Sequence, residues 1–361
     1  MKRVLFAGGG TGGHIYPALA IRETLIEKLG NNLVTAYAGQ LDGMEAGIVG
    51  RIDGLPFLPI RAQGMPRTLS MKWLSFPFRN ILGFWDAMGQ IKAFSPDLVI
   101  ATGGYVAFPT LMAARWRGCP FVIHEQNAAI GVTNRLFTGS AAKILLTYGE
   151  AFQKPDSRVV VTGNPVRKAF LSPSAASGRF NKKDGESWIL VVGGSRGARS
   201  LNESVIDLGK SWLPSHPKMN VLHVAGERDY AMVKERVGEN PRHQVVPYLH
   251  DIREAFDLAD LLVSRAGATI LAEIAVCGKP AILVPFPHAT DNHQEKNAKT
   301  LAARGAAMLL LDSDLNKKSL AVCIEGILAP ETLKKMGEAM RGSRPPNVEE
   351  SIWTALQPLL A

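Results

Sequence analysis

Two segments of the chain repeat one pattern, in which a short apolar run leads through a cluster of glycines into a helical pattern. Residues 4–7 precede the first cluster, residues 8–13, and residues 189–192 precede the second, residues 193–198. Glycines at a strand-to-helix turn let the backbone approach a phosphate at the start of the helix. Since 361 residues are more than one hydrophobic core usually organises, the repeat predicts two α/β domains, each with such a turn.

The rest of the chain alternates apolar runs with amphipathic stretches, which is typical of βαβ units and parallel sheets. In the first half the predicted strands are residues 3–7, 33–39, 97–101 and 120–123, and a helix is predicted at 17–29, with Pro17 in its first turn. In the second half the predicted strands are residues 188–192, 220–224, 244–246, 261–264 and 281–284, and the predicted helices are 198–212, 268–277 and 292–304. The domain boundary is predicted near residue 163, and residues 172–186 are predicted to form a surface loop.

The charge of the chain indicates an anionic partner. The net charge is +9, and residues 1–160 hold the larger share, with 16 basic and 10 acidic side chains. Residues 61–85 contain no acid and four basic side chains, which are Arg61, Arg67, Lys72 and Arg79. Large apolar side chains such as Trp73 and Trp85 lie between them, a composition that suits either an anionic bilayer surface or an ordinary loop and helix whose aromatics face the core. No recognition motif predicts a nucleic acid as partner.

Several classes of protein are disfavoured. The longest apolar runs, such as residues 306–311, are far shorter than the roughly 18 residues that a bilayer span needs. The first glycines follow too soon after Lys2 and Arg3 for a signal peptide, which favours a cytosolic chain. The three cysteines are widely spaced and predict neither a disulfide framework nor a zinc-ligand pair.

The first glycine cluster satisfies the G-x-G-x-x-G pattern of dinucleotide-binding proteins through Gly8, Gly10 and Gly13. That class also needs an acidic residue at the end of the second strand to hold a ribose, and this chain has Gln40 there, with Asp42 displaced into the loop. A nicotinamide or flavin enzyme is therefore an alternative and not the main prediction.

His14 follows the glycines directly, at the mouth of the predicted helix. An imidazole there has the chemistry to take a proton from a sugar hydroxyl, and the alternative is that His14 only caps or orients the loop. Glycines and polar groups also end the next two strands, at residues 102–105 and 124–127. Because the carboxyl ends of parallel strands meet at one edge of the sheet, this recurrence favours a ligand site over isolated structural hydrogen bonds.

In the second half, residues 264–269 close a strand and begin a helix, and Glu273 lies one turn into that helix. The amides at the helix start are predicted to hold a phosphate and the Glu273 carboxylate to accept two ribose hydroxyls; the alternative is a capped helix with a solvated glutamate. His288, Asp291 and His293 are close in sequence, but their spacing matches no known metal site, so no metal is predicted.

Six motifs span the chain: residues 9–14 (GGTGGH), 103–106 (GGYV), 124–127 (HEQN), 163–167 (GNPVR), 193–198 (GGSRGA) and 264–268 (SRAGA). Their order and spacing resemble the MurG family of bacterial N-acetylglucosaminyltransferases, part of glycosyltransferase family 28. The resemblance implies a GT-B fold, an α/β architecture of two Rossmann-like domains with parallel sheets that face each other across a deep cleft. Residues 1–162 would bind the acceptor and face the membrane, residues 163–340 would bind the nucleotide sugar, and residues 341–361 would form a helix that packs back on the first domain.

The resemblance also implies a reaction and a location. The family transfers N-acetylglucosamine from UDP-N-acetylglucosamine (UDP-GlcNAc) to the 4-hydroxyl of the muramoyl sugar of lipid I, with inversion, and produces lipid II for peptidoglycan. His14 would be the base, without a metal or another cofactor. The protein would be peripheral on the cytoplasmic face of the bacterial inner membrane, bound to anionic lipid through its first domain, with other cell-wall synthesis proteins as candidate partners. A GT-B enzyme with another glycolipid or a soluble acceptor is the alternative.

The same resemblance assigns substrate contacts. Residues implied for UDP-GlcNAc are Thr11, Gly12, Gly13, Asn127, Arg167, Ser195, Leu249, Ala268, Thr269, Ile270, Leu271, Ala272, Glu273 and Gln294. Residues implied for the acceptor side are Gly103, Gly104, Tyr105, His124 and Glu125. Within the donor set, Glu273 would hold the ribose, Leu249 would lie near the uracil, and Gln294 would contact the sugar.

Overall fold

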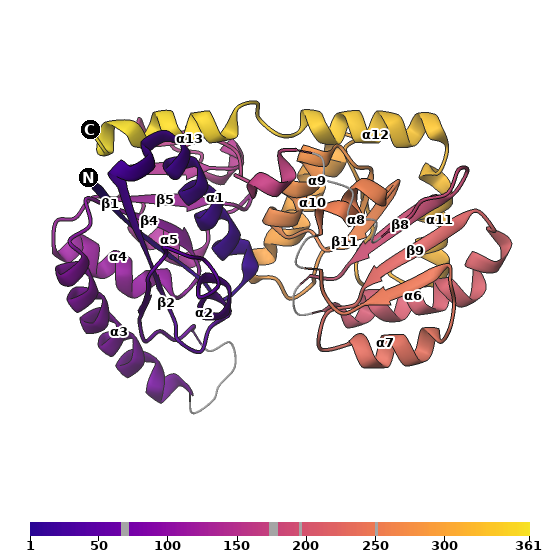
Figure 1. The fold of residues 1–361 in the computed structure, drawn as a ribbon, viewed down its shortest axis with the longest axis horizontal. Helices are drawn as coiled ribbons and strands as arrows, with labels where there is room; N and C mark the ends of the chain where they lie inside the picture. Colours follow the sequence, from indigo (N-terminus) through magenta and orange to yellow (C-terminus); the bar gives the residue numbers. More distant parts are fainter. Residues whose placement is uncertain (66–71, 173–179, 195–196, 250–251) are drawn as a thin grey trace. The chain divides into compact units, whose positions relative to one another are not determined.

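The computed structural model describes residues 1–65, 72–172, 180–194, 197–249 and 252–361. These residues form two compact α/β units (Figure 1). The first unit consists of Met1–Arg167 with Pro345–Ala361, and the second of Lys168–Arg344. The division thus falls after Arg167 and after Arg344, a few residues beyond the boundaries that the sequence led us to expect.

The first unit contains a parallel sheet whose described strands follow the order β3-β2-β1-β4-β5-β6-β7. The strands are β1 (Lys2–Gly8), β2 (Leu33–Gly39), β3 (Phe57–Pro59), β4 (Leu98–Gly103), β5 (Phe121–Glu125), β6 (Lys143–Leu146) and β7 (Val159–Val161). In β1, Val4 and Phe6 belong to one buried cluster, whereas Leu5 and Ala7 belong to another. Successive side chains point to opposite faces of a strand, so an unbroken apolar run serves a sheet that is covered on both faces.

Helices of the first unit cover this sheet. They are α1 (Gly12–Leu29), α2 (Met44–Val49), α3 (Lys72–Phe94), α4 (Ala107–Trp116), α5 (Val132–Phe137) and α13 (Val348–Leu356). The last of these, α13, comes from the far end of the chain and packs beside α1 (Figure 1), with Ile352 and Leu356 in the same cluster as Val4. An ion pair of 2.5 Å between Lys28 and Glu350 joins the two helices at the surface.

The second unit repeats the architecture, with a parallel sheet whose described strands follow the order β10-β9-β8-β11-β12-β13. The strands are β8 (Ser187–Val192), β9 (Met219–Val224), β10 (His243–Val246), β11 (Leu261–Ser264), β12 (Ala281–Leu283) and β13 (Met308–Leu309). The helices are α6 (Arg199–Ser211), α7 (Tyr230–Val237), α8 (Arg253–Leu258), α9 (Ala268–Cys277), α10 (His293–Ala303), α11 (Lys317–Ile327) and α12 (Pro330–Gly342).

The predicted strands are confirmed to within two residues at each end, and α9 has the predicted bounds. The first helix differs, because α1 begins at Gly12 and not at Pro17, so that Pro17 lies inside the helix. Glycine has a low helix propensity, which is why the apolar pattern did not indicate the extra turn. That turn carries His14 on the helix itself. The predicted loop at 172–186 falls partly outside the described residues.

Candidate active site

The carboxyl ends of four neighbouring strands of the first unit, β2, β1, β4 and β5, bring the predicted polar segments together. The glycine cluster follows β1, residues 102–105 end β4, and Gln126 follows β5. Gly104 has a φ of +78°, and a Cβ atom there would lie 2.3 Å from the carbonyl oxygen of Gly9. Glycine at this position therefore lets the loop after β4 press against the loop after β1.

The imidazole of His14 is held by acceptors on one side. Its Nδ1 lies 2.9 Å from the carbonyl oxygen of Thr102 and 3.1 Å from Oε1 of Gln126. A carbonyl oxygen cannot donate, so Nδ1 carries the proton, and in the neutral ring Nε2 has the lone pair. In return, the hydroxyl of Thr102 donates to the carbonyl oxygen of His14 at 2.7 Å. In this tautomer the imidazole has the chemistry to accept a proton at Nε2, as a general base does.

Buried polar side chains lie behind His14, at and just after the carboxyl end of β5. Gln126 donates through Nε2 to Nδ1 of His124 at 3.0 Å, and Nε2 of His124 donates to the carbonyl oxygen of Gly163 at 3.2 Å. Burial lowers the pKa of His124 to about 4, so this imidazole is neutral near pH 7. The bond from Nε2 of Gln126 to His124 fixes the orientation of the Gln126 amide, so that its Oε1 points toward His14.

Glu125 organises the loop that follows β5. Its carboxylate accepts from the backbone and side-chain amides of Asn127, at 3.1 and 3.0 Å, and from Gly131 and Asn134. The side chains of Glu125 and His124 are 1% and 0% exposed. Two of the residues expected on the acceptor side therefore lie behind the strand ends, where they position the groups at the surface of the site.

The residues expected to bind the donor are distributed over the two units of the chain. Thr11, Gly12, Gly13, Asn127 and Arg167 belong to the first unit, and the others belong to the second. The guanidinium of Arg167 lies over the ring of Tyr16 on α1, 4.6 Å from its centroid. Ser195 falls outside the described residues.

In the second unit, α9 begins after Gly267, and the helix start is formed by Ala268, Thr269 and Ile270. The side chain of Glu273 is only 5% exposed. This burial contradicts the alternative of a solvated glutamate, because a carboxylate is rarely buried without a polar role. Leu249, the residue expected near the uracil, is also buried.

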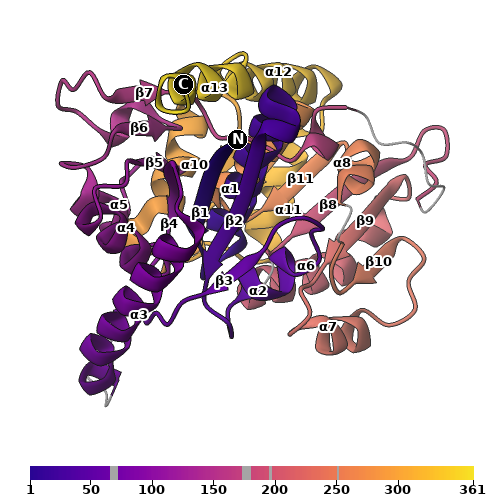
Figure 2. The same ribbon diagram turned by 60° about the vertical axis from the view of Figure 1, so that its left-hand side comes forward.

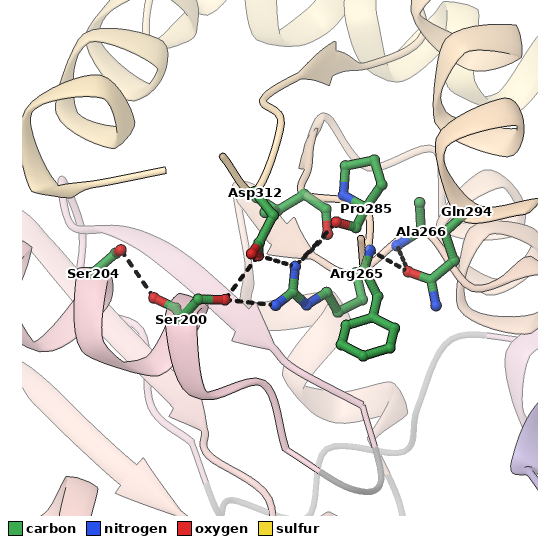
Figure 3. Close-up of polar contacts among 9 residues, drawn as sticks. Ser200, Ser204, Arg265, Ala266, Pro285, Gln294 and Asp312 are labelled. Carbon is green, nitrogen blue, oxygen red and sulfur yellow. Dashed lines mark hydrogen bonds and ion pairs between the residues drawn. The ribbon is translucent and has the colours of Figure 1, made fainter. Parts of the chain in front are cut away.

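A buried ion pair ties together the strand ends around this helix start (Figure 3). Arg265 follows β11 and donates through Nη1 to Asp312 at 2.6 Å, and also to the carbonyl oxygens of Val284 and Pro285. Ser200, near the start of α6, accepts from Nη2 of Arg265 and donates to the same Asp312 oxygen, both at 2.8 Å. The pair therefore joins segments that follow β8, β11, β12 and β13.

Gln294 is oriented by the same loops (Figure 3). Its Oε1 accepts from the backbone amides of Ala266, at 3.2 Å, and Phe286, at 2.9 Å. With the oxygen so occupied, the side chain offers its NH₂ group as a donor to a ligand. Within the described ranges, no group of three His, Cys, Asp or Glu side chains is arranged to hold a metal ion.

One further residue that contacts the glycine loop, Glu45 on α2, was not predicted from the sequence. Its carboxylate is wholly buried and accepts from the backbone amide of Gly10 at 3.1 Å. The amide that a dinucleotide pyrophosphate would approach therefore has an acceptor from within the protein, which counts against a nicotinamide or flavin enzyme. The sequence offered no signal for this contact, because Glu45 lies on a short helix beyond the end of β2.

Two Rossmann-like α/β units, each with a parallel sheet and a glycine turn after its first strand, are the architecture of GT-B glycosyltransferases. A solved glycosyltransferase of kitacinnamycin shares the fold, with a TM-score of 0.73 at 15% identity. The family models for the N-terminal and C-terminal domains of glycosyltransferase family 28 match residues 4–146 and 188–351. The chain belongs to glycosyltransferase family 28, and within it to the MurG family.

Its relatives resemble it over nearly their whole length. The chain is 39% identical to the UDP-N-acetylglucosamine--N-acetylmuramyl-(pentapeptide) pyrophosphoryl-undecaprenol N-acetylglucosamine transferase of Desulfitobacterium hafniense, over 97% of each chain. It is 38% identical to a Bacillus cereus enzyme of the same description, over 99% of each chain. The crystal structure of Acinetobacter baumannii MurG matches 99% of this chain and 100% of its own, with a TM-score of 0.77 and 30% identity.

Proposed function

We propose that the protein transfers N-acetylglucosamine from UDP-GlcNAc to the N-acetylmuramyl sugar of lipid I, the undecaprenyl-pyrophosphoryl pentapeptide, and so forms lipid II for peptidoglycan synthesis. Relatives that match the chain over 97–99% of their length, at 38–39% identity, are named as transferases with this donor and acceptor. The observation that carries the mechanism is the orientation of His14, whose Nδ1 lies 2.9 Å from the carbonyl oxygen of Thr102 and whose Nε2 is therefore the basic nitrogen.

In the proposed step, Nε2 of His14 takes the proton of the 4-hydroxyl of the muramyl sugar. The oxygen forms a bond to the anomeric carbon of N-acetylglucosamine while the bond from that carbon to the phosphate oxygen breaks, with inversion. UDP leaves with the electron pair. Backbone amides at the start of α9 would stabilise the charge that develops on its phosphate, in the way that an oxyanion hole does, so the step calls for no metal or cofactor.

The donor contacts that we propose are given for each unit separately. In the second unit, Glu273 would bind the ribose, Leu249 the uracil and Gln294 the sugar, and Ser195 and residues 268–272 are further proposed contacts. The orientation of Gln294 supports its part, because the bonds from Ala266 and Phe286 occupy Oε1 and leave the NH₂ group to donate to a sugar hydroxyl. In the first unit, Thr11–Gly13, Asn127 and Arg167 are the residues that we propose to contact the donor, and Gly103, Gly104 and Tyr105 are those that we propose for the acceptor.

We also propose that α3 and α4 of the first unit attach the protein to anionic lipid at the cytoplasmic face of the inner membrane. The two helices lie side by side (Figure 2), and the ring of Trp116 meets that of Phe84 edge to face at 6.2 Å. Large apolar side chains are exposed on both helices and together form what we term the apolar surface, in which Trp116 is 77% and Phe78 70% exposed. Its other exposed members are Trp73, Leu74, Ile81, Leu82, Trp85 and Met112. Such a surface is unusual unless it meets a partner or a membrane.

The charges around this surface differ from the sequence expectation. Arg61 is paired with Asp86 through two bonds of 2.6 and 2.7 Å, so it adds no net charge. Arg79, Arg115 and Arg117 are exposed. Basic side chains beside exposed Trp and Phe suit an anionic headgroup layer, which supports a peripheral association. Among the described residues, no helix has the length and apolar character to cross a bilayer.

The proposed function is tested by offering UDP-GlcNAc with a lipid I analogue and measuring disaccharide product and free UDP. We expect His14→Ala to lower turnover by about two to four powers of ten, because a positioned base contributes about that much, and added imidazole to restore part of the rate. Turnover near that of the unsubstituted protein in a folded His14→Ala variant would remove His14 as the base. Transfer to a different glycolipid or soluble acceptor, without transfer to lipid I, would favour the alternative activity.

A further inference from the structure

Glu45 is a buried carboxylate beneath the first glycine loop. Its side chain is 0% exposed, although glutamate is among the residues least often buried. Oε2 accepts from the amide of Gly10 at 3.1 Å and Oε1 from the amide of Gln40 at 3.0 Å. The two bonds connect the loop after β1 with the loop after β2, and hydrogen bonds to a charged acceptor are among the stronger ones.

Glycines form the walls around this carboxylate. A Cβ atom at Gly9 would lie 2.6 Å from Oε1 of Glu45, and one at Gly43 would lie 2.4 Å from the same atom. The ring of Tyr105 lies against Gly10, where a Cβ atom would lie 3.0 Å from Cε1. The carboxylate therefore fills the space between the loop and α2, and larger side chains at these positions would displace it.

The location of Glu45 has two consequences. First, Gly10 is followed by Thr11 and the first turn of α1, which carries His14, so the bond to Gly10 limits where that imidazole lies. The hydroxyl of Tyr37 fixes the other end of the loop by donating to the carbonyl oxygen of Gly8 at 2.8 Å. Second, the carboxylate is itself an anion that occupies the amide of Gly10. A phosphate that this amide would otherwise attract is therefore repelled.

We propose that Glu45 is a positioning and specificity residue: it holds the loop that places His14, and it keeps phosphate groups away from Gly9 and Gly10. The pyrophosphate of a substrate is then restricted to the helix start at residues 11–13. The positioning half of this inference rests on the proposed function, because it concerns the rate of a step in which His14 is the base. The exclusion of phosphate does not depend on that function.

Exclusion is tested by titrating the ¹⁵N-glycine-labelled full chain with inorganic pyrophosphate and following the amide resonance of Gly10. In the unsubstituted protein we expect the resonances of Gly12 and Gly13 to shift more than that of Gly10, whereas in Glu45→Ala the shift of Gly10 becomes as large as theirs. A Gly10 shift as large as those of Gly12 and Gly13 in the unsubstituted protein, or no increase of the Gly10 shift in folded Glu45→Ala, would overturn the exclusion. This measurement needs no turnover, so it decides the point even if the proposed reaction is wrong.

Positioning is tested by kinetics on Glu45→Gln, in which an NH₂ group replaces one of the two accepting oxygens. We expect kcat to fall about 10- to 100-fold, which is more than any rise in the KM for UDP-GlcNAc, because a displacement of about 1 Å at a catalytic group has an effect of this size, whereas residues 11–13 supply only part of the proposed donor contacts. Glu27→Gln, an exposed change on α1, is the control and keeps its kcat.

A second variant covers the case in which Glu45→Gln does not fold. Gly43→Ala keeps the charge of Glu45 but places a Cβ atom 2.4 Å from Oε1, so it moves the carboxylate, and we expect the same loss of kcat. An unchanged kcat in folded Glu45→Gln or Gly43→Ala would refute the positioning role. If His14→Ala itself keeps its turnover, the proposed base fails, and the Gly10 titration still tests exclusion.

Discussion

The substitution Asp312→Asn isolates the charge of the buried pair that joins the strand ends of the second unit. The side chains of Arg265 and Asp312 are 8% and 17% exposed, and the bond between them is 2.6 Å long. Asparagine has nearly the same shape, so the change removes the negative charge with little change in packing. What remains is a buried guanidinium whose nearest full counter-charge has gone.

The size of the effect follows from the remaining contacts. Removing one partner of a buried ion pair costs about 3–5 kcal/mol, because an uncompensated charge stays in the interior. Here the carbonyl oxygens of Val284 and Pro285 still accept from Arg265, at 3.1 and 3.2 Å, which favours the lower end of that range. We therefore expect the free energy of unfolding of the second unit to fall by about 3 kcal/mol. For a unit of this length that corresponds to a melting temperature lower by about 6–12 °C.

The assay is calorimetric and urea-induced unfolding of the full chain, which follows the transition of the second unit. Asp314→Asn is the matched control, because that side chain is exposed two residues further on and its change should cost no more than about 0.5 kcal/mol. A loss below about 1 kcal/mol in Asp312→Asn, as for a surface ion pair, would show that solvent screens the pair and would refute the reasoning.

Two further predictions concern pH and membranes. Burial lowers the pKa of His223 to about 3 and of His243 to about 4, and their rings meet at 3.3 Å between Nδ1 and Nε2. The unfolded chain takes up a proton on each histidine near pH 6.5, whereas the folded chain does not, so the second unit should lose stability as pH falls below about 6.5. At pH 5 the loss should be up to about 2 kcal/mol per histidine. His243→Gln should reduce this loss of unfolding free energy, measured by urea unfolding, and an equal loss in the variant would contradict its origin in these histidines. The double substitution Phe78→Ser with Trp116→Ser should weaken co-sedimentation with phosphatidylglycerol vesicles, and Arg79→Glu should weaken it further at low salt. Vesicle binding that is unchanged by all three substitutions would show that α3 and α4 are not the membrane-binding surface.

Some features of the site could be predicted from neighbouring residues alone. His14 follows its glycines in the chain, and Gly103 and Gly104 follow a strand, so the order of residues was enough to propose them. Other features depend on residues that only the fold brings together. Arg61 was expected to contribute positive charge within an acid-free segment, but Asp86 lies just outside that segment, and the turn of α3 brings it to the guanidinium. His124 and Glu125 were expected on the acceptor side because they end a strand, but only the fold shows that both side chains are buried and hydrogen-bond to Gln126 and Asn127.

The sequence by itself determined the two parallel sheets, the position of most strands, the glycine turns and the family. These properties are encoded locally, since apolar runs bury themselves on both faces of a sheet and glycines mark the turns where backbone must come close. Only the tertiary structure decided the protonated nitrogen of His14, the bond from Glu45 to Gly10 and the pairing of Arg265 with Asp312. Each of these joins residues more than thirty positions apart, and a hydrogen bond depends on distances of a few tenths of an ångström that no local pattern specifies.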